Sequence, residues 1–408
     1  MNSGNNKDNN IDNHFTVLGN ISASAFLANY WQKQPLLIRN AIPGFTTPVS
    51  PDELAGLACH ENVESRIVLE KDGSTPWELR HGPFDENLFS ELPETHWTLL
   101  VQECNKYIPE LAALLDQFCF IPNWRIDDIM VSYAAPQGSV GPHVDQYDVF
   151  LLQGLGKRLW QIDSESSQHL DFLPDTELRI LQNFTANHEW LLEPGDMLYL
   201  PPGVAHHGIA QDDCVTLSVG FRAPSHYELL TAFAEDQFSH ITDPFKIPRY
   251  QDPDLLLTDN CGEITRQALG NIIEILQSYT RNEHDMARWF GRFITEPKFD
   301  VNDFQPEIAY SRDSLIGAIQ QHRLVCRSEN VRFSYIKATR ETTYLYVNGR
   351  EFELSADLQQ LAPVICNQRQ IESSQVGGLL AEDTLASIVV NLFNEGHLYF
   401  PQQEENDL

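Results

Sequence analysis

The sequence predicts a mainly β protein whose core is a double-stranded β-helix, a jelly roll of the cupin type, followed by a helical region and a mixed C-terminal domain. Three observations predict this fold class. From about residue 124 to 224, short apolar runs alternate with turns that contain Gly and Pro, which is typical of a barrel or sandwich. After Pro224 the apolar spacing becomes helical, and after about residue 300 helices and strands mix. The β region also contains candidate metal ligands, which favour a jelly roll within that class.

Two helices are expected before the β region. Ser22 is a candidate N-cap for a helix over residues 22–33, and Pro35 ends this helix. A second helix begins at Ser50-Pro51-Asp52-Glu53, which has a serine cap, a proline at the first helical position and an acid three residues after the cap. Residues 1–19 begin with a polar run without an apolar segment, so we expect a disordered lead and no signal peptide.

The remaining elements follow from local periodicity. The predicted core strands are Asp128–Tyr133, Tyr147–Gln153, Arg158–Ile162, Asp196–Leu200 and Val215–Phe221. The predicted helices beyond them are His226–Ile241, Glu263–Tyr279, Glu283–Thr295, Ser314–Gln321 and Asp383–Asn394. A hairpin is expected over Arg332–Ala338 and Thr342–Asn348, with a closing strand at His397–Phe400. The order after residue 300 suits a winged-helix domain.

The helical region has an apolar stripe. Ala268, Ile272, Ile275 and Leu276 fall on one side of the helix predicted over Glu263–Tyr279. Such a stripe either covers a core or forms an interface between subunits, and the sequence alone leaves both alternatives open.

Composition and charge limit the compartment and the partners. No apolar run is long enough to span a membrane, and the seven scattered cysteines form no CxxC pair, which indicates a reducing cytoplasm. The net charge of −31 repels nucleic acid and attracts basic partners, although it also serves solubility. Residues 301–408 contain 8 basic and 15 acidic side chains, so we expect no DNA binding by the winged helix.

The candidate metal ligands are His143, Asp145 and His206. His143 and Asp145 are two residues apart and therefore share one face of an extended chain. His206 follows the turn Pro201-Pro202-Gly203. Two imidazoles and one carboxylate form the facial triad of non-haem Fe(II) oxygenases. His207 is the alternative ligand, because neighbouring residues of a strand face opposite ways and only one of the two histidines can serve.

The chain resembles a known family in several motifs. They are Asn123–Asp128, His143–Phe150, Glu193–Asp196, Tyr199–Gly203, Ser218–Pro224 and, near the N-terminus, Tyr30–Ile38. In combination these motifs resemble the bacterial JmjC-type ribosomal oxygenases, the arginine hydroxylases of large-subunit ribosomal protein sixteen. The resemblance runs from about residue 20 to the end. It implies a JmjC catalytic domain over residues 20–225, a dimerisation region over 226–299 and a winged-helix-like domain over 300–408, in a homodimer.

The resemblance also implies Fe(II), 2-oxoglutarate and O2 as cofactor and co-substrates. Arg158 begins a predicted strand and is the expected partner of the far carboxylate of 2-oxoglutarate, because a guanidinium binds a carboxylate through two parallel hydrogen bonds. Lys157 beside it should face away. Ser132 is expected to donate its hydroxyl to the same carboxylate, and Ser218 is a second candidate for that role.

The implied substrate is an arginine of a basic ribosomal protein, hydroxylated at its β-carbon. Asp128 is the expected partner of the substrate guanidinium, and Tyr147 is expected to pack along the side chain. Asp128 shares its strand face with Met130 and Ser132, whereas Asp127 and Asp148 have the opposite parity. A purely structural role for Asp128, as a turn or helix cap, remains open.

Other functions stay open on the residues alone. A non-oxygenase cupin, either an isomerase or a cupin that uses Zn or Mn, has no need of Arg158. A metal-free binding module would not need an intact triad. Histidine hydroxylases and lysine demethylases share the triad, and only the chemistry of the substrate pocket separates them from an arginine hydroxylase.

Overall fold

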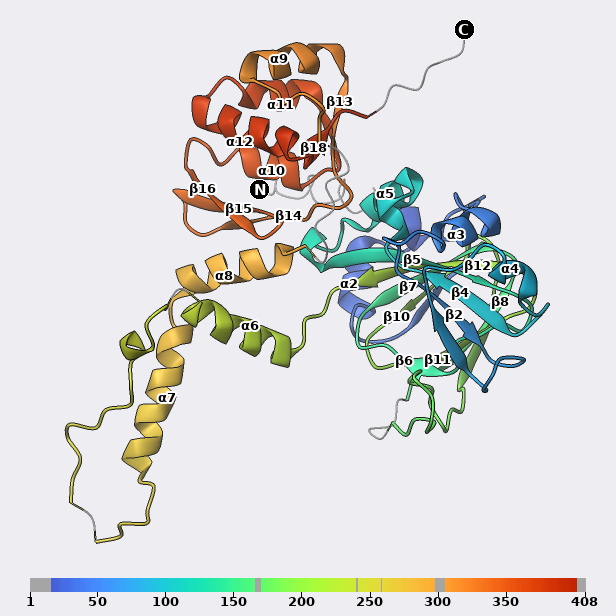
Figure 1. Ribbon diagram of the computed structural model, residues 1–408, viewed down its shortest axis with the longest axis horizontal. Helices are drawn as coiled ribbons and strands as arrows, with labels where there is room; N and C mark the ends of the chain where they lie inside the picture. The colour runs from blue at the N-terminus through green and yellow to red at the C-terminus, as the bar shows by residue number, and fades with distance from the viewer. Residues whose placement is uncertain (1–15, 166–169, 240, 258, 298–304, 402–408) are drawn as a thin grey trace, which may run out of the picture. The chain divides into compact units, whose positions relative to one another are not determined.

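The computed structural model describes residues 16–165, 170–239, 241–257, 259–297 and 305–401. It divides the chain into two compact units, Met1–Ala223 and Pro224–Leu408, and each unit is described by itself below (Figure 1).

Two antiparallel sheets build the first unit. The larger sheet contains, in spatial order, β1 (Leu36–Ile38), β10 (Met197–Leu200), β7 (Val149–Leu155), β12 (Cys214–Phe221), β5 (Ile126–Ala134), β4 (Trp97–Val101), β2 (Ser65–Leu69) and β3 (Glu78–His81). The smaller sheet contains β6 (His143–Val144), β11 (Ala205–Ala210), β8 (Arg158–Asp163) and β9 (His188–Leu192). These two sheets form the predicted jelly roll.

Burial along the strands explains their composition. All eight residues of β12 are buried, because this strand lies in the middle of the larger sheet with neighbours on both sides. In β8, buried and partly exposed residues alternate, so one face of this strand points into the barrel and the other toward solvent. Arg158, Trp160 and Ile162 are the inward residues.

Short helices surround the larger sheet. They are η1 (Thr16–Leu18), α2 (Ala23–Asn29), α3 (Pro51–Leu57), α4 (Leu88–Glu91), η2 (Cys104–Lys106), α5 (Pro109–Leu115), η3 (Asp116–Phe118) and η4 (Asn123–Arg125). The predicted capping box at Ser50 and Glu53 is confirmed. The predicted disordered lead extends too far, since Val17 and Leu18 in η1 are fully buried; residues 1–15 lie outside the described residues.

The helix predicted over residues 22–33 ends early, at Asn29. The physical reason is a tertiary contact rather than Pro35. Gln32 adopts a left-handed conformation (φ 55°), and its backbone N–H donates to the hydroxyl of Tyr199 at 2.8 Å. This hydrogen bond stabilises a non-helical backbone at Gln32, so the helix ends before Pro35.

A buried carboxylate joins this N-terminal segment to the barrel. Asp148 is completely buried and accepts hydrogen bonds from Tyr199 Oη at 2.6 Å and from Gln32 Nε2 at 2.8 Å. Arg125 Nη2 lies 3.3 Å from the same carboxylate and supplies the counter-charge. A buried carboxylate needs such partners, because desolvation without them is costly. Asp148 therefore points into the core, as its parity predicts, and not toward the metal ligands.

The second unit begins with helices. They are α6 (His226–Phe238), η5 (Pro244–Lys246), α7 (Arg266–Thr280) and α8 (Glu283–Thr295). The ring of Trp289 in α8 packs against Phe233 of α6 with centroids 5.0 Å apart. By contrast, α7 has no buried residue, and its Leu269, Ile273 and Leu276 are more than half exposed. No helix among the described residues is long and apolar enough to cross a membrane.

The C-terminal part mixes helices and two small sheets. Its elements are α9 (Arg312–Gln321), β13 (Leu324–Arg327), β14 (Phe333–Lys337), β15 (Thr342–Val347), β16 (Arg350–Ser355), α10 (Leu361–Cys366), β17 (Gln370–Glu372), α11 (Ser373–Leu379), α12 (Asp383–Asn394) and β18 (Leu398–Tyr399). The hairpin and the helix Asp383–Asn394 are confirmed, whereas β16 adds a third strand to the hairpin that the sequence did not predict. This part has its own apolar core.

We expect Asp148→Asn to lower the free energy of unfolding by about 3 kcal/mol, because Arg125 loses its counter-charge while it stays mostly buried. Chemical denaturation followed by tryptophan fluorescence measures the loss. The control is Glu177→Gln, whose side chain is 76% exposed, and it should change stability by less than about 0.5 kcal/mol. Equal stability of the two variants would contradict the structural role of Asp148.

Candidate active site

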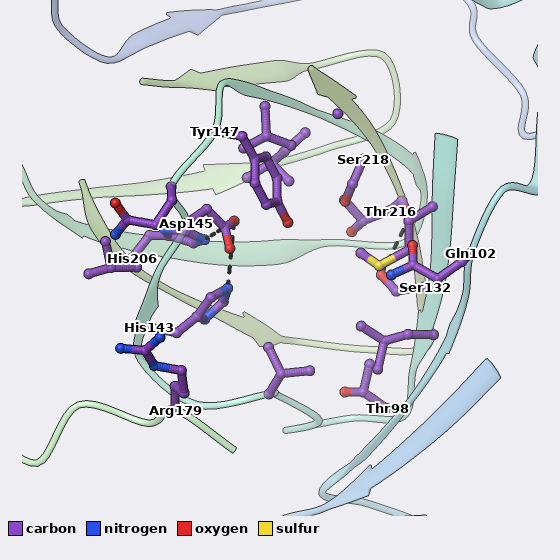
Figure 2. A pocket seen from close by; sticks show the side chains of 18 of the residues that line it. Thr98, Gln102, Ser132, His143, Asp145, Tyr147, Arg179, His206, Thr216 and Ser218 are labelled. Carbon is purple, nitrogen blue, oxygen red and sulfur yellow. Dashed lines mark hydrogen bonds and ion pairs between the residues drawn. The ribbon is translucent and has the colours of Figure 1, made fainter. Parts of the chain in front are cut away.

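The paired strands β6 and β11, with the loop that follows β6, bring three candidate metal ligands together. His143 in β6 lies directly opposite His206 in β11, and their ring centroids are 4.2 Å apart. Asp145 follows β6, and its Oδ2 lies 3.6 Å from His206 Nε2 and 3.9 Å from His143 Nε2 (Figure 2). One ligand atom from each residue lies within 4.8 Å of the others, which is close enough for all three to hold one metal ion.

Backbone carbonyls orient both imidazoles. His143 Nδ1 lies 2.9 Å from the carbonyl oxygen of Gly141, and His206 Nδ1 lies 3.0 Å from that of Val204. A carbonyl only accepts, so each Nδ1 carries the proton and each Nε2 keeps its lone pair for a metal. Burial lowers the pKa of His206 to about 4, and the nearby His143 adds to this effect. His206 is therefore a neutral ligand at neutral pH.

The structure separates His207 from the ligand cluster. Among the described residues, only His143, Asp145 and His206 form a group that could hold a metal. The ring of His207 instead lies near Phe184, with centroids 6.1 Å apart, and its Nε2 has no hydrogen-bond partner. The ambiguity between the two neighbouring histidines is thus resolved by the register of β11. The donor set of two imidazoles and one carboxylate fits the facial triad of Fe(II) sites.

A buried cation lies in the same cavity. Arg158 is 3% exposed, and no carboxylate among the described residues pairs with it. Its guanidinium donates only to neutral oxygens, those of Ser132, Thr216 and the Gly208 backbone, at 3.4–3.5 Å. These bonds are long, Nε has no partner, and burial lowers the pKa of the guanidinium. An anion that enters the cavity would meet a cation whose charge is not compensated.

Gly208 makes room for this arginine. A Cβ atom at position 208 would lie 2.7 Å from Arg158 Nε and 2.8 Å from the ring of Trp160. The guanidinium in turn lies 5.0 Å from the centroid of that ring. Gly208 is therefore required by packing across the β8–β11 pair, and nothing in the sequence pattern indicated it. Lys157, as predicted, faces away from the cavity and pairs with Glu193 at 2.5 Å.

Neutral hydroxyls line the wall opposite the arginine. Ser132 in β5 lies directly across from Thr216 in β12, and Ser218 lies two residues further along the same face. All three are buried, and Figure 2 shows them on the same side of the cavity. The sequence analysis included Ser132 and Ser218 but missed Thr216. The parity that Thr216 shares with Ser218 was the signal that could have found it.

Two aspartates, not one, line the cavity near the start of β5. Asp127 and Asp128 both face it, although their opposite parity predicted that only Asp128 would. The register of β5 explains the difference: Ile126 pairs with Phe221 and Ile129 with Val219, so both aspartates oppose Gly220 alone. Such a bulge turns two successive side chains toward one side.

Asp128 also has a structural partner. Its Oδ2 accepts the backbone N–H of Glu103 at 2.9 Å, and Glu103 has a left-handed conformation with φ 52°. Asp128 therefore caps this turn and also lines the cavity, so a structural role and a binding role are both compatible with its position.

Tyr147 faces the cavity from a bend, not from a strand. The strand predicted from Tyr147 begins at Val149 instead, because Asp148 turns into the core. Figure 2 shows the Tyr147 ring beside Asp145 and above the ligand cluster. The side chain is 42% exposed as a whole, but burial of its hydroxyl end and the nearby Asp145 raise the pKa of Tyr147 above its usual range. It therefore carries its proton at neutral pH.

The cavity as a whole has a volume of about 470 Å³, which is typical of small-molecule sites. Its wall also includes Arg179, which lies beside His143 in Figure 2. The guanidinium carbon of Arg179 lies 4.6 Å from the centroid of the Phe172 ring. Arg179 belongs to the long connection between β8 and β9, where no periodicity in the sequence marked it as a site residue.

Comparisons with known proteins agree with this architecture. Residues 113–229 match the JmjC domain family, and residues 274–399 match the ROXA-like winged helix. The chain is 33% identical to the ribosomal protein uL16 3-hydroxylase of Escherichia coli over 92% of this chain and 96% of that protein. It is 39% identical to a probable ribosomal oxygenase of Haemophilus influenzae over 60% of this chain and 58% of that protein. The solved structure of YcfD, a ribosomal oxygenase from Escherichia coli in complex with cobalt and 2-oxoglutarate, matches with a TM-score of 0.81 at 32% identity, over 94% of this chain and 99% of that one. The predicted fold class is confirmed.

We expect His206→Ala and His207→Ala to behave differently toward a metal. Losing a ligand should weaken Co(II) binding by more than the roughly 10- to 100-fold that loss of an outer-sphere partner costs. His207→Ala should bind Co(II) as the unsubstituted chain does, because its ring lies outside the cluster. Calorimetric titration with Co(II) compares the two variants, and a reversal of their order would overturn the assignment.

Proposed function

Because the chain belongs to the JmjC ribosomal oxygenases, we propose that it is an Fe(II)- and 2-oxoglutarate-dependent hydroxylase of an arginine side chain in the large-subunit ribosomal protein uL16. The observation that carries the proposal is a complete facial triad in the same cavity as an uncompensated buried arginine, in a chain that matches the uL16 3-hydroxylase over nearly its whole length.

The triad supplies the position of the metal. His143, Asp145 and His206 would hold the ion from one side, and the rest of its coordination sphere would be left to co-substrate and O2. When bound, Fe(II) with 2-oxoglutarate provides the oxidising chemistry, which inserts one oxygen of O2 into a C–H bond and releases succinate and CO2. The protein orients both partners and excludes water from the buried end of the cavity.

Arg158 binds the far carboxylate of 2-oxoglutarate in this proposal. The anion compensates a guanidinium whose partners among the described residues are all neutral, and Ser132 and Ser218 add hydroxyl donors from the opposite wall. A cupin that lacks an anionic co-substrate would gain nothing from a buried cation at this position.

Asp128, together with Asp127, binds the guanidinium of the substrate arginine, and Tyr147 packs along its aliphatic part. The bulge in β5 provides two carboxylates for one planar cation, which suits a guanidinium better than a neutral imidazole. A histidine hydroxylase or a lysine demethylase would use the same triad and is tested by the assay below.

The remaining parts of the proposal concern organisation and location. We assign residues 20–225 to the catalytic domain, 226–299 to a dimerisation region and 300–408 to a winged-helix-like domain that does not bind DNA. Exposed apolar side chains of α7 support a homodimer. A ribosomal protein as substrate and seven free cysteines support a cytoplasmic location.

The assay for this function is anaerobic Fe(II) loading of the full chain, followed by incubation with 2-oxoglutarate, O2 and uL16. We expect succinate formation and a gain of one oxygen on one uL16 arginine, both lost in His143→Ala. Fragment mass spectrometry distinguishes arginine from histidine hydroxylation and from loss of a methyl group. Metal binding without 2-oxoglutarate turnover would overturn the proposal in favour of another cupin activity.

Ser132→Asp tests the role of Arg158 by charge. The new carboxylate would face the guanidinium, so the chain without ligands should melt no lower than the parent, while 2-oxoglutarate should bind at least about tenfold more weakly. The control is Ser132→Ala, which removes the hydroxyl with its two long hydrogen bonds, to Arg158 and to the Thr216 carbonyl, but adds no charge. If Ser132→Asp bound 2-oxoglutarate as well as Ser132→Ala, Arg158 would not be the carboxylate partner.

A further inference from the structure

A row of buried polar side chains crosses three strands of the larger sheet. Ser132 in β5 lies opposite Thr216 in β12, and Thr216 lies opposite Gln153 in β7. Residues directly opposite in antiparallel strands project to the same face, so the three side chains form one line. They are 4%, 1% and 0% exposed, and none of them is charged. Ser132 and Thr216 line the cavity, whereas Gln153, next to Thr216 at the end of the row, does not.

The hydrogen bonds of Gln153 have fixed directions. Its Nε2 donates to the carbonyl oxygens of Leu155 at 2.7 Å and Gly156 at 3.4 Å, so Oε1 faces the other way. That oxygen accepts the hydroxyl of Thr216 at 3.1 Å. Because the Thr216 proton is committed to Gln153, the hydroxyl oxygen presents only lone pairs to Arg158, whose Nη1 donates to it at 3.4 Å.

We propose that Gln153 is a positioning residue for 2-oxoglutarate, acting through Thr216 to orient the guanidinium of Arg158. This inference rests on the proposed function, because the far carboxylate of 2-oxoglutarate is the group that the guanidinium would bind. Without Gln153, the Thr216 hydroxyl is free to turn its proton toward Arg158, so that two donors would face each other. The guanidinium would then lose one of the neutral oxygens that fix its plane.

The absence of charge on Ser132, Thr216 and Gln153 also matters for the binding of the co-substrate. A carboxylate at position 153 would face the carbonyl oxygens of Leu155 and Gly156, which accept hydrogen bonds and cannot donate them. The amide therefore fits this position and also leaves the charge of Arg158 uncompensated for the co-substrate. An orienting partner that carried a negative charge would compete with 2-oxoglutarate for the same guanidinium.

The test compares Gln153→Leu, Thr216→Val and the double variant. With Mn(II) in place of Fe(II), calorimetry measures the binding of 2-oxoglutarate and of 2-oxopentanoate, a keto acid without the far carboxylate. Gln153→Leu should weaken the binding of 2-oxoglutarate by about tenfold, the size of effect expected when a residue that orients a binding group is lost. The binding of 2-oxopentanoate should be unchanged. In turnover, the KM for 2-oxoglutarate should rise by the same factor while kcat at saturation is retained.

The double variant separates positioning from general loosening. If Gln153 acts through Thr216, the double variant should bind 2-oxoglutarate no more weakly than Thr216→Val alone. Gln161→Leu is the control, because Gln161 lies in β8 outside the cavity and its side chain donates to Glu189; the binding of both ligands should be unaffected. Circular dichroism and melting curves check that each variant is folded.

Each outcome bears on one proposal. Equal weakening of 2-oxoglutarate and 2-oxopentanoate by Gln153→Leu, or fully additive effects in the double variant, would overturn the positioning role. The same holds if Gln153→Leu binds 2-oxoglutarate normally. Failure of the unsubstituted chain to bind 2-oxoglutarate at all would instead overturn the proposed function, so the two failures are distinguishable.

Discussion

The site depends on one constraint, the pairing of His143 with His206 across β6 and β11. A slip of one residue would turn one imidazole out of the barrel, because strand side chains alternate. β6 has only two residues and cannot hold this register by its own ladder. Backbone hydrogen bonds on both sides of it hold the register instead: Leu181 donates to the carbonyl of Pro142, and Gly203 donates to that of Asp145, both at 2.8 Å.

The loop that follows β6 and contains Asp145 is fixed at its far end by Asp148, whose side chain points away from the candidate ligands. Asp145 points to the ligand cluster, whereas Asp148, three residues on, is buried among Arg125, Tyr199 and Gln32. The contacts of Asp148 tie the loop to the start of β5 and to the segment after α2. The N-terminal segment therefore contributes to the site indirectly, by limiting how far the ligand loop can move.

Local pattern was enough to predict the elements whose signals are local. The candidate triad and the capping box at Ser50 follow from parity, turn residues and spacing, whereas the role of Arg158 was expected from the family resemblance. The departures come from tertiary contacts: Tyr199 draws Gln32 out of the helix, and the bulge opposite Gly220 turns Asp127 into the cavity. Gly208 and Gln153 were not predicted, because their importance depends on the residues opposite them in neighbouring strands. A single sequence does not show which strands pair or in which register.

In the proposed function, the charges of the cavity divide it between two reactants. Arg158 is buried and has no acidic partner among the described residues, while Asp127 and Asp128 line the cavity at half-buried positions near the start of β5. A dicarboxylate co-substrate gains by reaching the arginine and is repelled by the aspartates; a cationic side chain shows the opposite preference. Neither reactant therefore competes well for the other's place. If the proposal holds, an acidic protein can in this way admit a basic substrate and still bind an anion at Arg158, a buried cation without an acidic partner among the described residues.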